Sequence, residues 1–355
     1  MNPTLDDLQQ LTQFDPSGML ELVKAAPERA RLHFQMGQNH PLQAPSDTFH
    51  QLLVCGMGGS GSTGDLLQAL CTESKLPIWV NKSAKLPAWV DSHTLVIGVS
   101  YSGNTAETLA CMQAAKARGA HLLVLSSGGA LSQFASENGI HCIPIAGGLP
   151  PRSALFDMLF ALLGSLYQLD SLKLSAAELA KSLEPLADWA HAFAISPQNP
   201  EPEPLKLAKS LRSHDVLFWG SDPETGIIAQ RWKNQWSENA KRLAVCSNLP
   251  ELNHNEMVAM CAAYHSQKAL VYLTLNSDVA DFDRVSLELV ADHIASVTVL
   301  QAQGENHLEK VLYLTCLGDF VSVYLALLNQ TDPTPIAPID EFKRRIALIP
   351  HGTTL

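Results

Sequence analysis

Five short apolar segments in the first half of the chain alternate with longer segments that have the composition of helices. The apolar segments are residues 52–55, 77–80, 95–99, 122–125 and 142–145. Strands that are apolar along their whole length are typical of parallel sheets, because helices cover both faces of such a sheet. The alternation therefore predicts an α/β fold with a five-stranded parallel sheet. The nearly all-apolar segment 153–167 predicts a helix that is buried or lies in an interface.

A second α/β unit is expected, because 355 residues exceed the usual size of one domain. The proline-rich segment PQNPEPEP cannot contribute to a core and marks a boundary. Beyond it, residues 216–220, 269–275 and 296–301 have the pattern of strands, and the stretches that begin at Gly226 and His307 have the pattern of helices. The predicted organisation is a helical lead-in over 1–45, a first subdomain over 46–196, a linker over 197–204, and a second subdomain over 205–355 with a basic C-terminal helix.

Composition narrows the possible partners and locations. The formal net charge of −11 argues against a nucleic-acid surface, which needs clustered Lys and Arg side chains. We expect no membrane span, since no wholly apolar segment reaches the roughly 18–20 residues that cross a bilayer. The N-terminus lacks the order of a signal peptide, and seven cysteines without a C-x-x-C pair indicate reduced thiols. These features favour a cytoplasmic protein with no nucleic-acid or membrane partner.

Two hydroxyl-rich turns follow the first and third predicted strands. One offers Gly59 and Ser60 within GMGGSGSTG, and the other offers Ser100, Ser102 and Thr105 within SYSGNT. Hydroxyl groups and free backbone N–H groups at a helix start suit a single phosphate. An SGNT turn alone is equally consistent with an ordinary helix cap. The two turns together predict a site for a phosphate monoester.

Other anions fit the glycine-rich turn less well. Gly56, Gly58 and Gly61 have the G-x-G-x-x-G spacing of dinucleotide sites, but the second strand ends in WVNK without the acidic residue that binds ribose. A Walker lysine and zinc-ligand spacings are also missing, so we expect no cofactor and no metal. The corresponding turn of the second half, FWGSDPETG, carries Asp222 and Glu224, which would repel a phosphate. We therefore assign the phosphate site to the first half.

Six motifs carry a family resemblance. They are, in order between Cys55 and Arg345, CGMGGSGSTG, SYSGNTAETL, LPPRSAL, WSENAK, ELNHNE and DPTPIAPIDEFKRR. In this order they resemble the SIS (sugar isomerase) superfamily, specifically the bifunctional phosphoglucose/phosphomannose isomerases. The resemblance implies two SIS subdomains, each a five-stranded parallel sheet flanked by helices, and a homodimer with shared active sites. It also implies that glucose 6-phosphate and mannose 6-phosphate are interconverted with fructose 6-phosphate through a cis-enediol.

The resemblance assigns three catalytic roles. Glu238 in WSENAK matches the base that moves a proton between C2 and C1, although an exposed carboxylate paired with Arg242 is an alternative. His254 in ELNHNE matches the acid–base group that opens the sugar ring and, in this family, comes from the partner subunit; alone, it is more typical of a surface histidine. Arg152 in LPPRSAL matches the cation that stabilises the enediolate, with a capping or interface arginine as the alternative.

Two further residues follow from the same resemblance. Lys343 in DEFKRR matches a lysine that reaches the sugar from the C-terminal helix, although a basic last helix is often only a surface feature. Thr334 in DPTP is the candidate for the threonine that gives room for the mannose epimer, with an alignment uncertain by a few positions.

Two other functions stay open at this point. The first alternative is a noncatalytic SIS sensor of a sugar phosphate. The second is an amino-sugar phosphate isomerase of the same superfamily. A helix-turn-helix with a basic face, typical of one class of sensor, is missing. Position 2 is Asn2 rather than the cysteine that hydrolyses glutamine in some amino-sugar enzymes.

Overall fold

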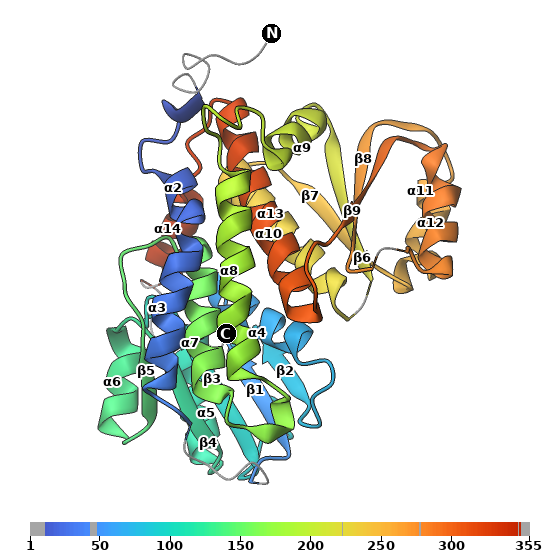
Figure 1. Cartoon of the computed structure of the whole chain (residues 1–355). Coiled ribbons are helices and arrows are strands. Elements are labelled where there is room, and N and C mark those ends of the chain that lie inside the picture. Colours follow the sequence, from blue (N-terminus) through green and yellow to red (C-terminus); the bar gives the residue numbers. More distant parts are fainter. Residues whose placement is uncertain (1–10, 43–47, 222, 277, 347, 349–355) are drawn as a thin grey trace.

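Two parallel sheets flanked by helices make up the molecule (Figure 1). The computed structural model describes residues 11–42, 48–221, 223–276, 278–346 and 348. The segment LDDLQQL of the predicted lead-in lies almost wholly outside them, whereas α2 (Met19–Lys24) and α3 (Ala26–Gln38) confirm helix within it. The predicted α/β class is confirmed.

The first sheet contains all five predicted strands. They are β1 (Gln51–Cys55), β2 (Ile78–Asn81), β3 (Thr94–Ser100), β4 (His121–Ser126) and β5 (His141–Pro144), in the order β2-β1-β3-β4-β5, with every pairing parallel. Every residue of the central strand β3 is buried, as expected for a strand covered on both faces. The turns after β1 and β3 therefore open at the same edge of the sheet, at neighbouring strands.

Helices of the first half pack closely on this sheet and on each other. They are α4 (Gly59–Leu70), α5 (Ala106–Ala117), α6 (Gly129–Glu137) and, after the short 3-10 helix η1 (Pro151–Ala154), α7 (Leu155–Leu166). Every residue of α7 is buried, which confirms the prediction for this apolar segment. Helix α3 approaches α7 so closely that a Cβ on Gly37 would lie 2.1 Å from the Ala161 carbonyl oxygen, so only glycine fits there.

The second sheet has four strands in the described part of the chain, so the prediction of five is wrong. They are β6 (Asp215–Ser221), β7 (Ala244–Leu249), β8 (His265–Thr274) and β9 (Ile294–Gln301), in the order β7-β6-β8-β9. After β9 the chain enters a long helix instead of a further strand. The sequence did not reveal β7, because this edge strand mixes apolar and polar residues and leaves Val245 half exposed.

Helices cover both faces of this sheet. Helix α10 (Thr225–Ala240) packs on β6, β7 and β8 and also reaches α4 of the first half, whereas α12 (Asp281–Ala291) packs on β9. The short elements η3 (Glu251–His254) and α11 (Glu256–Met260) follow β7. Helix α10 therefore joins the carboxyl-end turn of β6 to the first subdomain.

Helix α13 (His307–Leu328) is the central helix of the shared core. It is long and apolar enough to qualify as a membrane span, although it includes Glu309, Lys310 and Asp319 and is therefore not wholly apolar. In the fold, 94% of its most apolar window is buried inside the protein. That burial is typical of a core helix, because packing accounts for its apolar surface.

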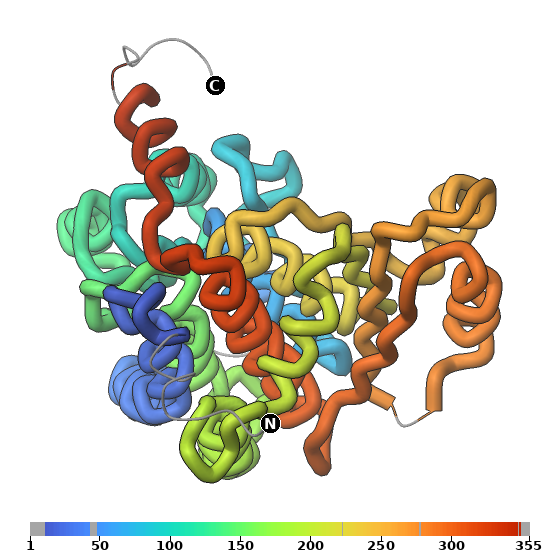
Figure 2. Tube along the Cα trace, turned by 90° about the horizontal axis from the view of Figure 1, so that it is seen from above, coloured from blue at the N-terminus to red at the C-terminus, as the bar shows by residue number. Residues whose placement is uncertain are grey.

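One apolar core joins the two halves. It runs from Val54 on β1 through Phe160 on α7 to Phe218 on β6 and Phe320 on α13. Between the halves, η2 (Asp170–Leu172) and α8 (Ala176–Phe193) precede α9 (Glu203–Leu211), which begins inside the proline-rich segment with a proline in its first turn. The exact subdomain boundaries stay a prediction. The C-terminal helix α14 (Ala337–Ile346) has no buried residue and extends away from the body (Figure 2).

Candidate active site

The two hydroxyl-rich turns lie against each other. Ser60 Oγ, at the start of α4, accepts a hydrogen bond of 3.1 Å from the Tyr101 N–H, in the turn after β3. Within that second turn, the hydroxyls of Ser100 and Thr105 are 2.9 Å apart. Ser102 is exposed, and its hydroxyl accepts a hydrogen bond from a backbone N–H two residues later. Hydroxyl groups from both turns thus gather where α4 and α5 begin.

Arg152 lies next to the glycine-rich turn. A Cβ on Gly59 would lie 2.7 Å from the Pro151 carbonyl oxygen and 3.3 Å from the Arg152 nitrogen, so the close approach of α4 to η1 requires glycine. This approach brings the predicted phosphate end and the predicted catalytic arginine into one site. The sequence places the two 93 positions apart, from Gly59 to Arg152, and only the fold joins them.

The guanidinium of Arg152 is the centre of the site. It is 2% exposed, and its Nε donates to Asn239 Oδ1 at 2.6 Å. Its Nη2 donates to the carbonyl oxygens of Pro333 and Thr334 at 2.7 and 3.0 Å. Its Nη1 lies 3.6 Å from Glu238 Oε2 and makes no hydrogen bond within the described part of the chain. The structure thus brings together three of the predicted residues: Arg152, Glu238 and Thr334.

The electrostatics of this centre follow from its burial. Burial lowers the pKa of the Arg152 guanidinium from its usual value, and the nearby Glu238 carboxylate partly opposes that change. Arginine stays charged in proteins, so the site holds a desolvated cation. The Lys241 ammonium also has a lowered pKa, because it is partly buried and close to Arg152. A buried cation with a free donor is suited to an anionic oxygen of a reacting sugar.

Arg152 belongs to a network of buried polar groups joined by hydrogen bonds. Arg231 Nη2 donates to the Arg152 carbonyl oxygen at 3.1 Å and to both Asp319 carboxylate oxygens at 2.8 Å. The Asn239 amide donates to Ser322 Oγ at 2.9 Å, which fixes the amide with its oxygen toward Arg152. Burial raises the pKa of Asp319, and Arg231 partly offsets that effect. This network fixes the orientation of the guanidinium.

Sequence reasoning did not find this network. Asp319 and Ser322 interrupt an otherwise apolar helix, α13, and that interruption was the available signal. A carboxylate inside such a helix needs a partner, because burying an unpaired charge is costly. The partner itself, Arg231, lies on α10 and is visible only in the fold.

The alternative pairing of Glu238 with Arg242 is wrong. Helix α10 ends at Ala240, and Lys241 takes a left-handed conformation with φ 55°, so residue 242 is not on the helix face that carries Glu238. The Arg242 guanidinium instead donates to the carbonyl oxygens of Arg212 and His214. The Glu238 side chain, 27% exposed, faces Arg152.

His254 and Lys343 lie apart from this centre. His254 ends η3 and is exposed, and its ring makes no hydrogen bond or ion pair with any described residue. Lys343 lies on the exposed helix α14 and likewise has no such partner among the described residues. The structure of one chain therefore brings neither residue into bonded contact with Glu238 or Arg152.

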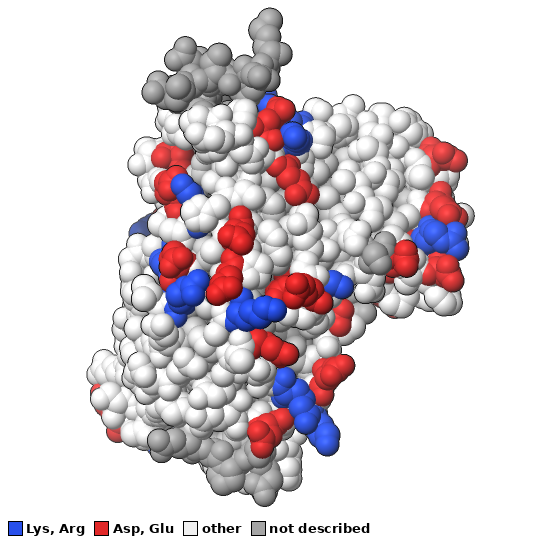
Figure 3. Space-filling view, viewed as in Figure 1, with Lys and Arg blue, Asp and Glu red and all other residues white. Residues whose placement is uncertain are grey.

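The surface charge and the arrangement of possible metal ligands in the described residues do not indicate a nucleic-acid site or a metal site. On the face shown in Figure 3, basic and acidic side chains are interspersed rather than gathered into a basic patch. The described residues contain no group of three or more His, Cys, Asp or Glu side chains placed to hold a metal ion. None of the seven cysteines forms a disulfide.

Comparison with known proteins assigns the fold and the family. Residues 201–346 match the model of the bacterial phospho-glucose isomerase C-terminal SIS domain. A bifunctional phosphoglucose/phosphomannose isomerase of Caldicellulosiruptor bescii is 34% identical over 93% of this chain and 99% of that protein. One of Aquifex aeolicus is 33% identical over 83% and 90%, respectively. A crystal structure of a hypothetical protein from Thermus thermophilus superposes with a TM-score of 0.73 at 16% identity, covering 97% of this chain and 94% of that one.

The agreement in sequence extends over nearly the whole chain and includes both subdomains. The chain belongs to the bifunctional phosphoglucose/phosphomannose isomerase family of the SIS superfamily.

Proposed function

We propose that this protein is a metal-independent aldose–ketose isomerase that converts glucose 6-phosphate and mannose 6-phosphate to fructose 6-phosphate. One observation carries the proposal: a buried arginine with a free Nη1 donor faces a carboxylate at 3.6 Å, beside two hydroxyl-rich turns. A module that only binds sugar phosphates needs the turns but has no use for a buried base–cation pair. The two relatives described above, which match 93% and 83% of this chain, are named for this activity.

In this proposal, different residues act on the phosphate end and on the C1–C2 end of the substrate. Ser60, Ser100, Ser102 and Thr105, with the N–H groups at the start of α4, hold the 6-phosphate. Glu238 takes the proton from C2 and returns it to C1, so the enediol forms and collapses without net change in protons. Arg152 stabilises the negative charge that develops on the enediolate oxygens. Glucose and mannose 6-phosphates differ only at C2 and give the same enediol, so one base serves both.

The position of Thr334 supports the second activity. Its carbonyl oxygen accepts from Arg152, and its hydroxyl is buried without a hydrogen bond among the described residues. In the proposal, this residue, whose backbone bonds to Arg152, lies next to C2 and C3 of the sugar. This position agrees with the role that the family resemblance assigned to it.

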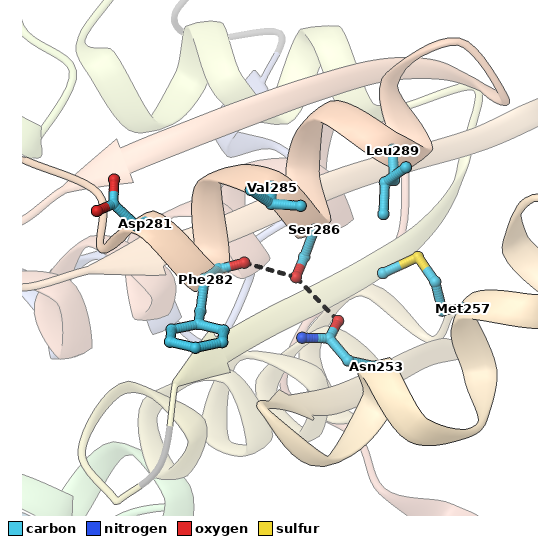
Figure 4. Close-up of a pocket in the computed structure, with 7 residues that line it drawn as sticks. All are labelled: Asn253, Met257, Asp281, Phe282, Val285, Ser286 and Leu289. Carbon is cyan, nitrogen blue, oxygen red and sulfur yellow. Dashed lines mark hydrogen bonds between the residues drawn. The ribbon is translucent and has the colours of Figure 1, made fainter.

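The proposal includes a homodimer in which the partner's His254 completes each site. The support is the exposed position of His254 and the apolar pocket beside it. Figure 4 shows Phe282 and Leu289 of α12 opposite Met257 and Asn253, and Ser286 Oγ donates to Asn253 Oδ1 at 2.9 Å. Phe282 is 78% exposed, which is unusual for so large an apolar side chain unless a partner covers it.

Complementation between two inactive variants tests the shared site. Mixing Glu238→Gln and His254→Asn subunits creates one intact site in each heterodimer, so we expect about a quarter of the wild-type activity after random exchange in a two-fold dimer. Glu238→Gln mixed with Arg152→Ala is the matched control and stays inactive, because both residues belong to one chain. Equal recovery in both mixtures, or none in either, would refute the shared site.

Assays with both sugars test the function. Purified protein in EDTA is given glucose 6-phosphate or mannose 6-phosphate, and fructose 6-phosphate is measured separately for each. The proposal predicts turnover of both sugars that added metal does not raise. Tight binding without turnover would favour a sensor, and ammonia release from glucosamine 6-phosphate would favour an amino-sugar enzyme. A cytoplasmic location is part of the proposal and agrees with seven cysteines that form no disulfide.

A further inference from the structure

Lys241 holds a backbone conformation that lysine rarely adopts. It ends α10 with φ 55°, in the left-handed region, where a Cβ is unfavourable and helix ends usually have glycine. The lysine side chain makes hydrogen bonds that a glycine at this position could not make. Nζ donates to the Pro333 carbonyl oxygen at 2.9 Å and to the Glu238 carbonyl oxygen. The side chain therefore ties the end of the helix that carries Glu238 to a turn far along the chain.

The turn at residues 332–334 is held from two sides. The Pro333 carbonyl oxygen accepts from both Lys241 Nζ and Arg152 Nη2, at 2.9 and 2.7 Å. Inside the turn, the Thr334 N–H donates to Asp332 Oδ1 at 2.8 Å. The Thr334 hydroxyl makes no hydrogen bond within the described chain, so no such bond holds it in place if the backbone of the turn moves. If the Lys241 side chain no longer binds this turn, Arg152 is the one cationic side chain among these contacts that still donates to it.

We propose that Lys241 is a positioning residue that sets the relative rates on the two C2 epimers, by fixing the turn that carries Thr334. The inference rests on the proposed isomerase function. The two sugars share their enediol and differ in the orientation of the C2 substituents, so they reach Glu238 through different rotations about C2–C3. Thr334 is bonded to Arg152 through its carbonyl oxygen, so a shift of its turn would change the space beside the guanidinium in which the proposal places that rotation.

Substitution by glycine tests this role directly. Glycine adopts the left-handed conformation without steric cost, so the helix end should form at least as well. Lys241→Gly removes both tethers, and Lys241→Arg keeps a cationic donor. Arg242→Met is the matched control, since Arg242 is the adjacent cation and bonds only away from the turn, to the Arg212 and His214 carbonyl oxygens. The kcat/KM for glucose 6-phosphate and for mannose 6-phosphate are measured for each protein.

Lys241→Gly is expected to change the ratio of the two kcat/KM values about tenfold, the size of one lost hydrogen bond to a charged group. We expect Lys241→Arg to restore most of the ratio and Arg242→Met to leave it unchanged. Hydrogen exchange of a peptide covering residues 329–341 should accelerate in Lys241→Gly alone. This second measurement reports on the tether without reference to activity.

Three outcomes would overturn the inference. An equal loss on both sugars would show that Lys241 does not set selectivity, and unchanged exchange at 329–341 would show that it does not hold the turn. The same change of ratio in Arg242→Met would assign the effect to general charge. A wild-type protein inactive on both sugars would refute the proposed function itself, which sets that failure apart from the others.

Discussion

The carboxyl ends of the two sheets are built alike but filled differently. In each half, a glycine at the end of the first strand packs against the start of the next helix: a Cβ on Gly56 would lie 2.9 Å from Ser60 carbon, and one on Gly220 would lie 2.3 Å from Thr225 carbon. In the first half, hydroxyl groups surround that turn, and none of them bonds to a carboxylate in the described structure. Among the described residues, no carboxylate therefore occupies the end at which we propose that the phosphate binds.

The second half supplies its own anion. Tyr272 Oη donates to Asp283 Oδ2 at 2.5 Å, and Ser221 Oγ donates to the same oxygen. Asp283 is buried, and burial together with its hydrogen bond raises the pKa of Tyr272, so the phenol stays protonated and donates. The donors that would hold a phosphate are thus already occupied. The same architecture gives the proposed binding site in one half and a closed polar cluster in the other, according to where a carboxylate lies.

The largest expected effect tests whether chemistry is confined to the open site. Glu238→Gln removes the proposed base and should lower kcat about a thousandfold or more, within the range for general acid–base groups. Glu224→Gln is the control, because it lies at the start of the same helix, beside the closed end. Steady-state kinetics on glucose 6-phosphate would contradict the account if Glu238→Gln kept its activity or if both variants lost it equally.

The next largest effect is expected on stability, in the buried network of Arg152, Arg231 and Asp319, to which both halves contribute. Asp319→Ala leaves Arg231 buried without its charge partner and should lower the free energy of unfolding by about 3–5 kcal/mol. Asp281→Ala removes an exposed ion pair on α12 and should change it by less than about 1 kcal/mol. Urea denaturation of both variants measures the difference. Similar losses would mean that the Asp319 pair does not stabilise the junction.

A matched pair of serines compares the two sheet ends directly. Ser100→Ala removes a hydroxyl from the open end and should raise KM for sugar phosphates about tenfold, as expected for a lost bond to a charged group. Ser221→Ala removes the hydroxyl at the closed end and should leave KM within about twofold. Should Ser221→Ala raise KM as much as Ser100→Ala does, the division between the halves would be wrong.

The smallest expected effect concerns the anion inside the closed end. Asp283→Asn weakens the hydrogen bonds from Tyr272 and Ser221 and should lower the free energy of unfolding by about 1 kcal/mol. KM and kcat should stay at their wild-type values, because this cluster does not touch the sugar. Thermal melting and steady-state kinetics check both parts, and a large loss of activity at unchanged stability would contradict the structural role.

Local patterns in the sequence predicted much of the fold. The apolar runs gave all five strands of the first sheet, but the edge strand β7 was missed, since its exposed positions break the apolar pattern. Glu224, thought to repel phosphate, lies 3.9 Å from His307, and Asp222 lies outside the described residues. The carboxylate that fills the closed end is Asp283, which is 62 positions from Ser221, so only the fold reveals it.

The candidate site shows the same limit. Resemblance supplied Arg152, Glu238 and Thr334, and the structure brings them together, although their roles stay a proposal. Asn239 lies in WSENAK, but neither that motif nor the sequence around Arg231 and Asp319 marks these residues as members of one network, because the contacts among them and with Arg152 span 79 to 88 positions. In the proposed dimer, His254 completes the site of the partner subunit, and the structure of a single chain does not test that arrangement.

A crystal structure of the Glu238→Gln protein with glucose 6-phosphate tests the central claim most directly. The account predicts the phosphate at the open end, with oxygens about 2.7–3.2 Å from the Ser100 and Thr105 hydroxyls, and the C1–C2 end of the sugar next to Arg152. A phosphate bound at the Ser221 turn, or a sugar whose C1 and C2 point away from Arg152, would contradict it.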